Sequence, residues 1–262
     1  MSSDIQGRCL LVRGSEVVCD SAGTPFLSPD GASRLAAPEA SLLSTAPDDS
    51  DPKSVRATWM PPDSTLPDDL QARSLRSFFG EMPEEDFWQA GRGYQLAHWD
   101  RTHRFCGVCG AATELCGVEV ARCCPSCGQT IYPRISPAVI VAVVRDGALL
   151  LAHNAQRNRP FYSVLAGFVE PGESLEECVV REVAEETSIH CGNVRYFTSQ
   201  PWPFPDSLMV AFTAEWVSGE IQVDNEEIDH AYWCSPDALP KVPPAPSVAR
   251  KLIDWFTGNF GS

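Results

Sequence analysis

The chain has 262 residues, 44% of them hydrophobic and 21% charged, which is enough for two domains that each bury a core. Its net charge of -15 argues against passive binding to nucleic acid or to an anionic membrane. No apolar run approaches the roughly 18 residues of a membrane span, and residues 1–20 lack the layout of a secretory leader. We therefore expect no membrane partner and a cytoplasmic location by default.

The N-terminal part, residues 1–100, begins with short apolar segments. Cys9 to Val12 and Val17 to Cys19 predict two β-strands. The stretch from Ser44 to Asp69 is rich in Pro, Asp and Ser, which predicts a loop or linker. Phe87 to Trp99 predicts a helix, although two glycines within it weaken the prediction. No residue pattern in this part indicates chemistry.

Two Cys-x-x-Cys knuckles follow, and the stretch between them, Ala111 to Cys123, can form a hairpin. This spacing is typical of a zinc ribbon, in which four thiolates surround a structural Zn²⁺. Because protein ligands would saturate the ion, we expect it to hold the fold and not to do chemistry. The predicted ligands are Cys106, Cys109, Cys124 and Cys127. Cys123 is an alternative to Cys124, but it would break the two-residue spacing.

The remaining cysteines show no ligand spacing. The total of eleven is odd, and without a secretory leader we expect thiols and metal ligands in preference to a disulfide framework. The predicted buried free thiols are Cys9, Cys19, Cys116, Cys178, Cys191 and Cys234.

From Pro133 the pattern changes to short apolar strands. Val139 to Val144, the turn Asp146-Gly147 and Ala148 to Ala152 predict a hairpin. Two further strands and a final helix are predicted downstream: Val210 to Val217, Ala231 to Cys234, and a helix capped by Ser247 through Val248, Leu252, Trp255 and Phe256.

A glycine loop feeds a helix rich in glutamate between Gly167 and Ile189. Three carboxylates fall within about one helical turn of each other and share one side: Glu182, Glu185 and Glu186. The roughly opposite side, which we expect to pack on a sheet, carries Val180, Val183 and Ala184. Like charges so close together repel, but hard oxygen ligands beside a glycine loop suit Mg²⁺ or Mn²⁺ that also holds substrate phosphates.

Local signals fix the start of this helix. Pro171-Gly172 is a turn signal, and Ser174 to Glu177 has the Ser-x-x-Glu form of a capping box. The helix should therefore begin directly after Glu173.

A proline-rich segment lies further along, from Ser199 to Ser207, with three prolines interleaved with two aromatic residues. The prolines fix the backbone, so the segment would present rings and polar groups with little entropy left to lose. Such a surface suits a flat ring and a ribose. The alternative is an edge loop that packs Trp202 and Phe204 into the core.

The glutamate-rich helix and its loop resemble the Nudix box. The matching residues, in order, are Gly167, Glu173, Arg181-Glu182, Val183, Glu185-Glu186 and Ile189. Ser188 stands where the signature has its second glycine. Glycine at a helix end supplies a left-handed cap, and another residue there costs roughly 1 kcal/mol. Because the carboxylates all precede this position, we expect the metal site to survive.

The segment SQPWPFP, followed by any residue and Ser, is similar to the motif that marks NADH pyrophosphatases within the Nudix superfamily. The resemblance covers residues 90–256. It implies an α+β protein with an N-terminal mixed α/β domain (1–100), a zinc ribbon (101–132) and a C-terminal Nudix α/β/α sandwich (133–262). It also implies a homodimer.

The resemblance further implies the metal site. Mg²⁺ or Mn²⁺ would be held by Glu182, Glu186, Glu227 and the backbone of Ala166, with Glu226 as the alternative to Glu227. Glu185 would hold a further metal or polarise water. Glu173 and Arg181 complete the catalytic residues, and we expect Arg181 to pair with Glu173 and brace the loop.

The substrate pocket is implied in the same way. Tyr132, from the partner subunit, and Phe168 would sandwich the nicotinamide, since stacking contributes about 1–3 kcal/mol per base; the alternative is that Tyr132 is an ordinary core residue. Arg76, or alternatively Arg73, would contact substrate from the N-terminal domain. The remaining expected pocket residues are Gln200, Pro201, Trp202, Pro203, Phe204, Pro205, Asp206, Ser207 and Ala249.

The predicted function is metal-dependent hydrolysis of the pyrophosphate of NADH or NAD, giving nicotinamide mononucleotide and AMP. One alternative is the same scission at the 5′ end of NAD-capped RNA. A second is hydrolysis of ADP-ribose or another nucleoside diphosphate derivative. A third is a dinucleotide sensor without hydrolysis, which the intact set of box carboxylates disfavours.

Overall fold

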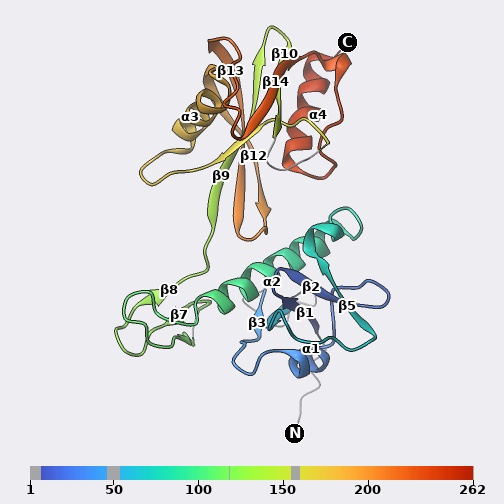
Figure 1. Ribbon diagram of the computed structural model, residues 1–262, viewed down its shortest axis with the longest axis vertical. Helices are drawn as coiled ribbons and strands as arrows, with labels where there is room; N and C mark the ends of the chain where they lie inside the picture. Colours follow the sequence, from blue (N-terminus) through green and yellow to red (C-terminus); the bar gives the residue numbers. More distant parts are fainter. Residues whose placement is uncertain (1–6, 46–53, 118, 155–159, 262) are drawn as a thin grey trace. The chain divides into compact units, whose positions relative to one another are not determined.

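The computed structural model describes residues 7–45, 54–117, 119–154 and 160–261. The chain forms two compact units (Figure 1). Unit 1 comprises Met1–Ile135 and the short segment Pro203–Asp206, and unit 2 comprises Ser136–Trp202 and Ser207–Ser262. None of the helices in the described part of the chain combines the length and the apolar character needed to cross a lipid bilayer.

Unit 1 contains a five-stranded sheet with the order β3-β4-β1-β2-β5. The two strands expected near the N-terminus are confirmed, and they form an antiparallel pair whose central residues are buried. The strands are β1 (Arg8–Arg13), β2 (Glu16–Asp20), β3 (Leu43–Ser44), β4 (Val55–Met60) and β5 (Leu70–Ser74). Two short helices accompany them, α1 (Pro29–Leu35) and the 3-10 helix η1 (Leu75–Phe78).

The predicted loop from Ser44 to Asp69 is wrong where it contains β4. This strand pairs in parallel with β1 and is almost entirely buried. Ala57 and Trp59 pack into one hydrophobic cluster while Met60 packs into another, so both faces of the strand are covered. The flanking Pro, Asp and Ser residues concealed this six-residue strand. The part of the predicted loop at 46–53 lies outside the described residues.

The expected helix before the ribbon is confirmed as α2 (Glu84–Thr102), which is longer than predicted at both ends. Its glycines allow close packing. A Cβ atom at Gly93 would lie 3.2 Å from side-chain carbons of both Ala57 and Leu10. Glycine in a helix costs about 1 kcal/mol relative to alanine, but here it lets the helix lie directly on the sheet.

The ribbon is a three-stranded antiparallel sheet of β6 (Glu114–Leu115), β7 (Arg122–Cys123) and β8 (Thr130–Ile131), which confirms the predicted hairpin. The prediction of Cys116 as a free thiol is wrong, because Cys116 forms a disulfide with Cys123. The hairpin brings their Cα atoms to 5.5 Å, which is within reach of a disulfide.

The disulfide also decides between Cys123 and Cys124 as the third knuckle cysteine, because Cys123 is bonded to Cys116 and is not free to bind zinc. The other predicted free thiols are confirmed as free and buried: Cys9, Cys19, Cys178, Cys191 and Cys234.

Unit 2 is built on a mixed sheet with the order β12-β13-β9-β10-β14, and β11 pairs with β9. The predicted hairpin is confirmed, and its turn residues Asp146 and Gly147 have φ values of 49° and 77°. The strands are β9 (Ser136–Arg145), β10 (Ala148–Asn154), β11 (Leu165–Phe168), β12 (His190–Trp202), β13 (Ser207–Ser218) and β14 (Ile228–Cys234). The helices are α3 (Leu175–Thr187), the 3-10 helix η2 (Pro236–Ala238) and α4 (Val248–Phe260).

The two long helices of unit 2 cover opposite faces of the sheet (Figure 1). Along β9, Val139, Val141 and Val143 pack in the cluster that contains α3. Ile140 and Ala142 pack in the cluster that contains α4. This alternation places one set of β9 side chains on each face and confirms the α/β/α sandwich.

Candidate active site and zinc site

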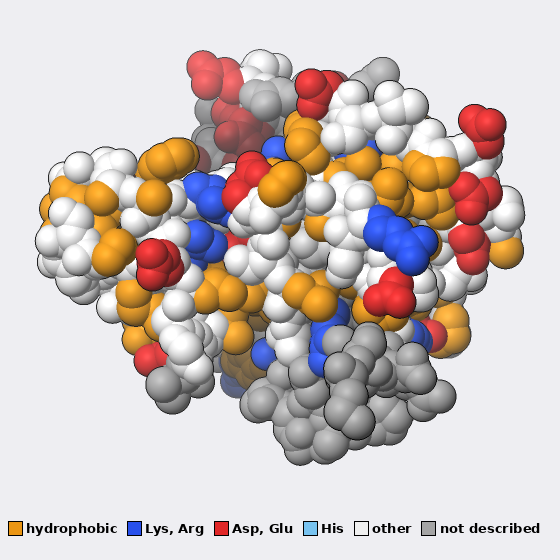
Figure 2. All heavy atoms as spheres, turned by 90° about the horizontal axis from the view of Figure 1, so that it is seen from below, with side chains coloured by type: hydrophobic (Ala, Val, Ile, Leu, Met, Phe, Trp, Pro, Cys, Tyr) orange, Lys and Arg blue, Asp and Glu red, His pale blue; other side chains and the backbone are white. Residues whose placement is uncertain are grey.

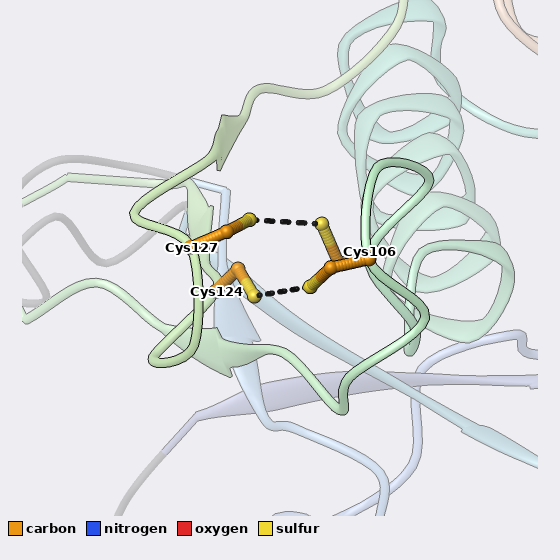
Figure 3. A group of neighbouring side chains, drawn as sticks. Cys106, Cys124 and Cys127 are labelled. Carbon is orange, nitrogen blue, oxygen red and sulfur yellow. Dashed lines mark hydrogen bonds between the residues drawn. The ribbon is translucent and has the colours of Figure 1, made fainter.

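The four knuckle cysteines of the ribbon converge on one point (Figure 3). Their Sγ atoms all lie within 4.8 Å of one another, and the pairs Cys106–Cys127 and Cys109–Cys124 are 3.6 and 3.5 Å apart. Zn–S bonds of about 2.3 Å in a tetrahedron would place thiolates about 3.8 Å apart. Backbone N–H groups of Cys109 and Val108 lower the pKa of Cys106 to about 7, which favours the thiolate. The four side chains therefore fit a structural Zn²⁺ site.

The start of α3 has the expected capping box. The Glu177 N–H donates to Ser174 Oγ at 3.3 Å, and the Ser174 N–H donates to a Glu177 carboxylate oxygen at 2.8 Å. At the other end Ser188 has φ 59°, the left-handed conformation in which glycine is favoured. The helix thus ends with a left-handed cap, although the residue there is serine and not glycine.

The buried stripe of α3 differs in part from the one we expected, which included Val183. Val179 and Val183 are fully buried, whereas Val180 is 36% exposed. Glu186 lies on the same stripe as Val179 and Val183, at helical spacing, and is only 6% exposed. A carboxylate therefore projects from the packed side of the helix. The sequence prediction places Glu186 on the charged side, opposite the apolar residues.

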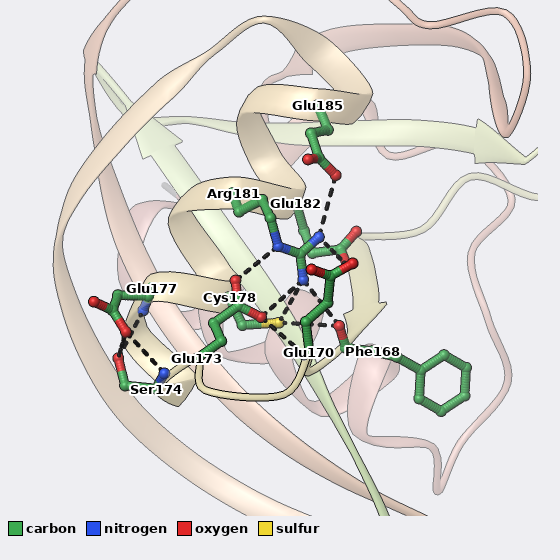
Figure 4. A network of polar contacts seen from close by, with 9 residues as sticks. All are labelled: Phe168, Glu170, Glu173, Ser174, Glu177, Cys178, Arg181, Glu182 and Glu185. Carbon is green, nitrogen blue, oxygen red and sulfur yellow. Dashed lines mark hydrogen bonds and ion pairs between the residues drawn. The ribbon is translucent and has the colours of Figure 1, made fainter.

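Arg181 is the centre of the charged cluster on α3 (Figure 4). It donates two hydrogen bonds to the Glu173 carboxylate, at 2.7 and 2.9 Å, and one to the Phe168 carbonyl at 2.9 Å. It also pairs with Glu182 at 2.9 Å and with Glu185 at 3.1 Å. The expected pairing of Arg181 with Glu173 is confirmed, and it ties the loop after β11 to the helix.

The cluster shifts the pKa values of its carboxyl groups in opposite directions. The hydrogen bond from Arg181 and the N–H of Glu170 lower the pKa of Glu173 to about 2. Burial raises the pKa of Glu182 above its ordinary value, and the nearby charges of Glu185 and Glu227 add to that shift against the opposing effect of Arg181. A divalent cation beside Glu182 would relieve both causes, because it would pair with the carboxylate in place of water.

Gly167 makes room for Glu182. A Cβ atom at this position would overlap the Glu182 carboxylate, so only glycine allows the close approach. The carboxylate consequently lies against the strand that carries Ala166, which supports the backbone of Ala166 as a neighbouring ligand.

The loop that carries Glu226 and Glu227 is held beside α3. The Asp224 N–H donates to the Glu186 carbonyl at 3.3 Å, and the Asp224 carboxylate accepts from the Glu227 and Ile228 N–H groups. The charge of Glu227 contributes to the raised pKa of Glu182, which supports Glu227 over Glu226 as the third carboxylate. Sequence reasoning missed Asp224, whose place before a turn was the available signal.

The carboxylates provide hard oxygen ligands from α3 and from a neighbouring loop, which is the donor set that Mg²⁺ and Mn²⁺ prefer. Among the residues that the structure describes, only the four cysteines already converge to metal-binding distances. Glu185 is open to solvent, with 61% of its side chain exposed. The residues thus fit a divalent cation that shares its coordination with substrate.

The proline-rich segment is divided between the two units. In unit 2, Gln200 is 3% exposed, donates to the Pro246 carbonyl at 3.0 Å and accepts from the Val248 N–H at 2.8 Å. Its side chain therefore holds the start of α4, next to Ala249, which is 8% exposed. Ser207 is also buried.

In unit 1, Pro203 and Phe204 pack against residues of the N-terminal part. A Cβ atom at Gly91 would come within 2.8 Å of Pro203. The Arg76 guanidinium lies over the Phe204 ring at 4.0 Å from its centroid. The structure thus brings together two of the predicted substrate-binding residues, and it supports the core-packing alternative for Phe204. Arg73 instead pairs with Glu81 at 2.7 Å.

Two aromatic rings expected to hold nicotinamide are exposed. Phe168 is 57% and Tyr132 is 56% exposed, so the alternative of Tyr132 as a core residue is wrong. Tyr132 belongs to unit 1 and Phe168 to unit 2. Figure 4 shows the Phe168 ring pointing away from the Arg181 cluster.

The sheet with a helix on each face and the carboxylate helix over a glycine define a Nudix hydrolase site. The profile of the NUDIX domain matches residues 134–256. The crystal structure of a NUDIX hydrolase from Nitrosomonas europaea shares the fold, with a TM-score of 0.52 at 20% identity over 60% of this chain and 91% of that chain.

Two further profiles match the rest of the chain. The NADH pyrophosphatase-like rudimentary NUDIX domain matches residues 6–99, and the NADH pyrophosphatase zinc ribbon domain matches 101–132. A protein of Erwinia tasmaniensis named NAD-capped RNA hydrolase NudC is 50% identical over 72% of this chain and 71% of its own length. The protein of that name from Klebsiella pneumoniae is 51% identical over 69% and 70%. The chain belongs to the NADH pyrophosphatase family of Nudix hydrolases.

Proposed function

We propose that this chain hydrolyses the pyrophosphate of NADH or NAD to nicotinamide mononucleotide and AMP, and that it removes the NAD cap from RNA by the same scission. The observation that carries the proposal is the Glu182 carboxylate, held against Gly167 with Glu185 and Glu227 close by. It lies in a chain about half identical to relatives named NAD-capped RNA hydrolases.

Glu182, Glu186, Glu227 and the backbone of Ala166 would hold the divalent cation. When bound, Mg²⁺ or Mn²⁺ neutralises pyrophosphate charge and lowers the pKa of water, which supplies the nucleophile near neutral pH. The protein's own part is to hold these oxygen atoms in place. Gly167 provides the space for Glu182, and Asp224 fixes the turn before Glu227.

Glu185 is the group placed to accept a proton from water. Its carboxylate is exposed at the open side of α3 and pairs with Arg181 at 3.1 Å. Arg181 and Glu173 have a positioning role in the site. They tie the loop after β11 to the helix and so hold Gly167 and Phe168 in register with the carboxylates.

The nicotinamide ring is recognised by stacking. Phe168 presents an exposed ring next to the glycine loop, and Tyr132 presents a second exposed ring from the end of the ribbon. In the proposed homodimer Tyr132 reaches the site of the partner subunit. Two aromatic faces against one flat ring contribute about 1–3 kcal/mol each.

Capped RNA would be recognised through its NAD cap. The face drawn in Figure 2 carries Lys and Arg side chains only as small separate groups among hydrophobic and acidic ones. With a net charge of -15, the protein offers little electrostatic attraction to a long RNA, and the dinucleotide supplies the specificity.

The test is product analysis by mass spectrometry with NADH, NAD, ADP-ribose and a short NAD-capped RNA, each with Mg²⁺ and with Mn²⁺. The proposal predicts nicotinamide mononucleotide and AMP from the dinucleotides and 5′-monophosphate RNA from the capped RNA. Cleavage of ADP-ribose alone would keep the Nudix chemistry but remove the assignment to NAD(H). Tight dinucleotide binding without any cleavage would indicate a sensor.

A further inference from the structure

A buried ion pair lies outside the residues assigned so far. Asp100, in the last turn of α2, pairs with Arg122 of β7, and their side chains are 0% and 3% exposed. The pair joins the helix of the N-terminal part to the middle strand of the ribbon, entirely within Met1–Ile135 of unit 1.

Both charged groups have further partners. One Asp100 oxygen accepts from the Trp59 Nε1–H at 2.8 Å and from the Ser41 N–H at 3.1 Å. Arg122 donates from Nε to the Thr113 hydroxyl at 2.8 Å and from a terminal nitrogen to the Thr113 carbonyl at 2.7 Å. The Thr113 hydroxyl in turn donates to the His103 carbonyl at 2.7 Å. The network connects β4, α2 and both sides of the β6–β7 hairpin.

Such a network is weak evidence for a gain in stability, because the cost of removing two charges from water offsets much of their attraction. It does impose a single geometry, since the planar guanidinium donates in fixed directions to Asp100 and Thr113. A buried ion pair of this kind is therefore suited to setting the position of β7.

The position of β7 determines that of Tyr132. Arg122 lies opposite Ile131 in the antiparallel pairing of β7 with β8, and Tyr132 is the next residue. β8 has only two residues, and both pair with β7. The Tyr132 ring itself is 56% exposed, and its hydroxyl donates a long hydrogen bond, 3.3 Å, to Glu119.

We propose that Asp100 and Arg122 are positioning residues for the nicotinamide end of the substrate: they hold β7, and through it the backbone that aims Tyr132. This inference rests on the proposed function, in which Tyr132 stacks on nicotinamide. If the Tyr132 ring is already held in place before the substrate binds, it loses less conformational freedom on binding. In the substrate a ribose separates nicotinamide from the scissile pyrophosphate, so the pair acts on substrate binding and not on the bond that breaks.

The test compares Arg122→Met, Tyr132→Ala and the double variant with NADH as substrate. Loss of a contact made equally in the ground and transition states raises KM and leaves kcat unchanged. We expect Arg122→Met to raise KM about tenfold, with kcat changed by less than about twofold, zinc content retained and faster hydrogen exchange at residues 130–132. Adding Tyr132→Ala to Arg122→Met should raise KM little further, because both act through one ring.

Arg8→Met is the matched control, because Arg8 pairs with Asp86 near the opposite end of the same helix, at 2.5 Å. It should leave KM at the wild-type value. If Arg122→Met fails to fold, Asp100→Asn with Arg122→Met keeps an acceptor for Trp59 and removes both buried charges. Loss of zinc or of cooperative unfolding in both variants would make the pair purely structural and overturn the proposal.

The outcomes separate this inference from the function on which it rests. A raised KM in Tyr132→Ala with a wild-type KM in Arg122→Met would reject the positioning role alone. Parallel falls in kcat and kcat/KM would likewise reject it. A wild-type KM in Tyr132→Ala, or no cleavage of NADH by the wild type, would overturn the stacking in the proposed function and the inference with it.

Discussion

The cysteine cluster of the ribbon and the carboxylate cluster of α3 differ in what surrounds them. Four sulfur atoms face one another within 4.8 Å, so protein ligands would complete the shell of a metal ion. On α3, Arg181 balances Glu173, Glu182 and Glu185 from one side, while Glu185 remains open to solvent. A closed set of ligands stabilises a fold, whereas a set that leaves coordination positions open can bind substrate as well.

The largest effect should come from Glu186→Gln in the carboxylate cluster of α3. This change keeps the shape of a side chain that is 6% exposed and removes its charge. We expect kcat on NADH to fall by roughly 100-fold or more at saturating Mg²⁺, because charge stabilisation at the pyrophosphate is lost. Glu176→Gln, an exposed change on the same helix, should keep wild-type turnover. Near-full activity in Glu186→Gln would refute its role.

A substitution in the cysteine cluster of the ribbon should lower stability and leave the chemistry unchanged. Cys124→Ser removes one of four ligands, and because binding of structural zinc is coupled to folding, the ribbon should lose its zinc and its amide protection. Zinc analysis and hydrogen exchange of residues 104–131 measure both. The control is Cys116→Ser with Cys123→Ser, which removes the disulfide but should keep the zinc. Full zinc occupancy in Cys124→Ser would contradict the assignment.

A smaller effect is expected from the brace between Arg181 and Glu173. The pKa of Glu173 is lowered to about 2, so its contribution to stability is fully present above its ordinary value near 4.5. That contribution is lost as the pH falls toward 2. Comparison of the free energy of unfolding of wild type and Glu173→Gln from pH 6 to pH 2 measures it. The difference between them should shrink as the pH falls; a constant difference would argue against the brace.

The smallest expected effect is an increase in stability. Ser188 adopts φ 59° at the end of α3, where glycine carries no penalty from Cβ. Ser188→Gly should stabilise the protein by about 0.5–1 kcal/mol in urea unfolding, with kcat unchanged. Ser235→Gly, at φ -73°, should give no gain. Equal destabilisation by both changes would show that Ser188 is not strained.

The sequence predicted structure correctly where the signal lies within one short segment. The capping box at Ser174, the turn at Asp146 and the cap at Ser247 depend on neighbouring residues, and each is confirmed. The cysteine knuckles are similarly local, and all four side chains converge.

Features that depend on distant partners could not be predicted in the same way. β4 is a strand because β1 and α2 cover it, in spite of its flanking prolines. The burial of Glu186 and the exposure of Val180 follow from how α3 rests on the sheet. The ion pair of Asp100 with Arg122 joins residues 22 positions apart, and nothing in either local sequence indicates it.

The most direct test of the open site is Mn²⁺ titration of wild type, Glu186→Gln and Glu176→Gln, followed by electron paramagnetic resonance, with NADH hydrolysis measured in the same samples. We predict that Glu186→Gln loses Mn²⁺ affinity and turnover together, while Glu176→Gln keeps both. Wild-type Mn²⁺ binding and turnover in Glu186→Gln would contradict the claim that the α3 carboxylates hold the metal for hydrolysis.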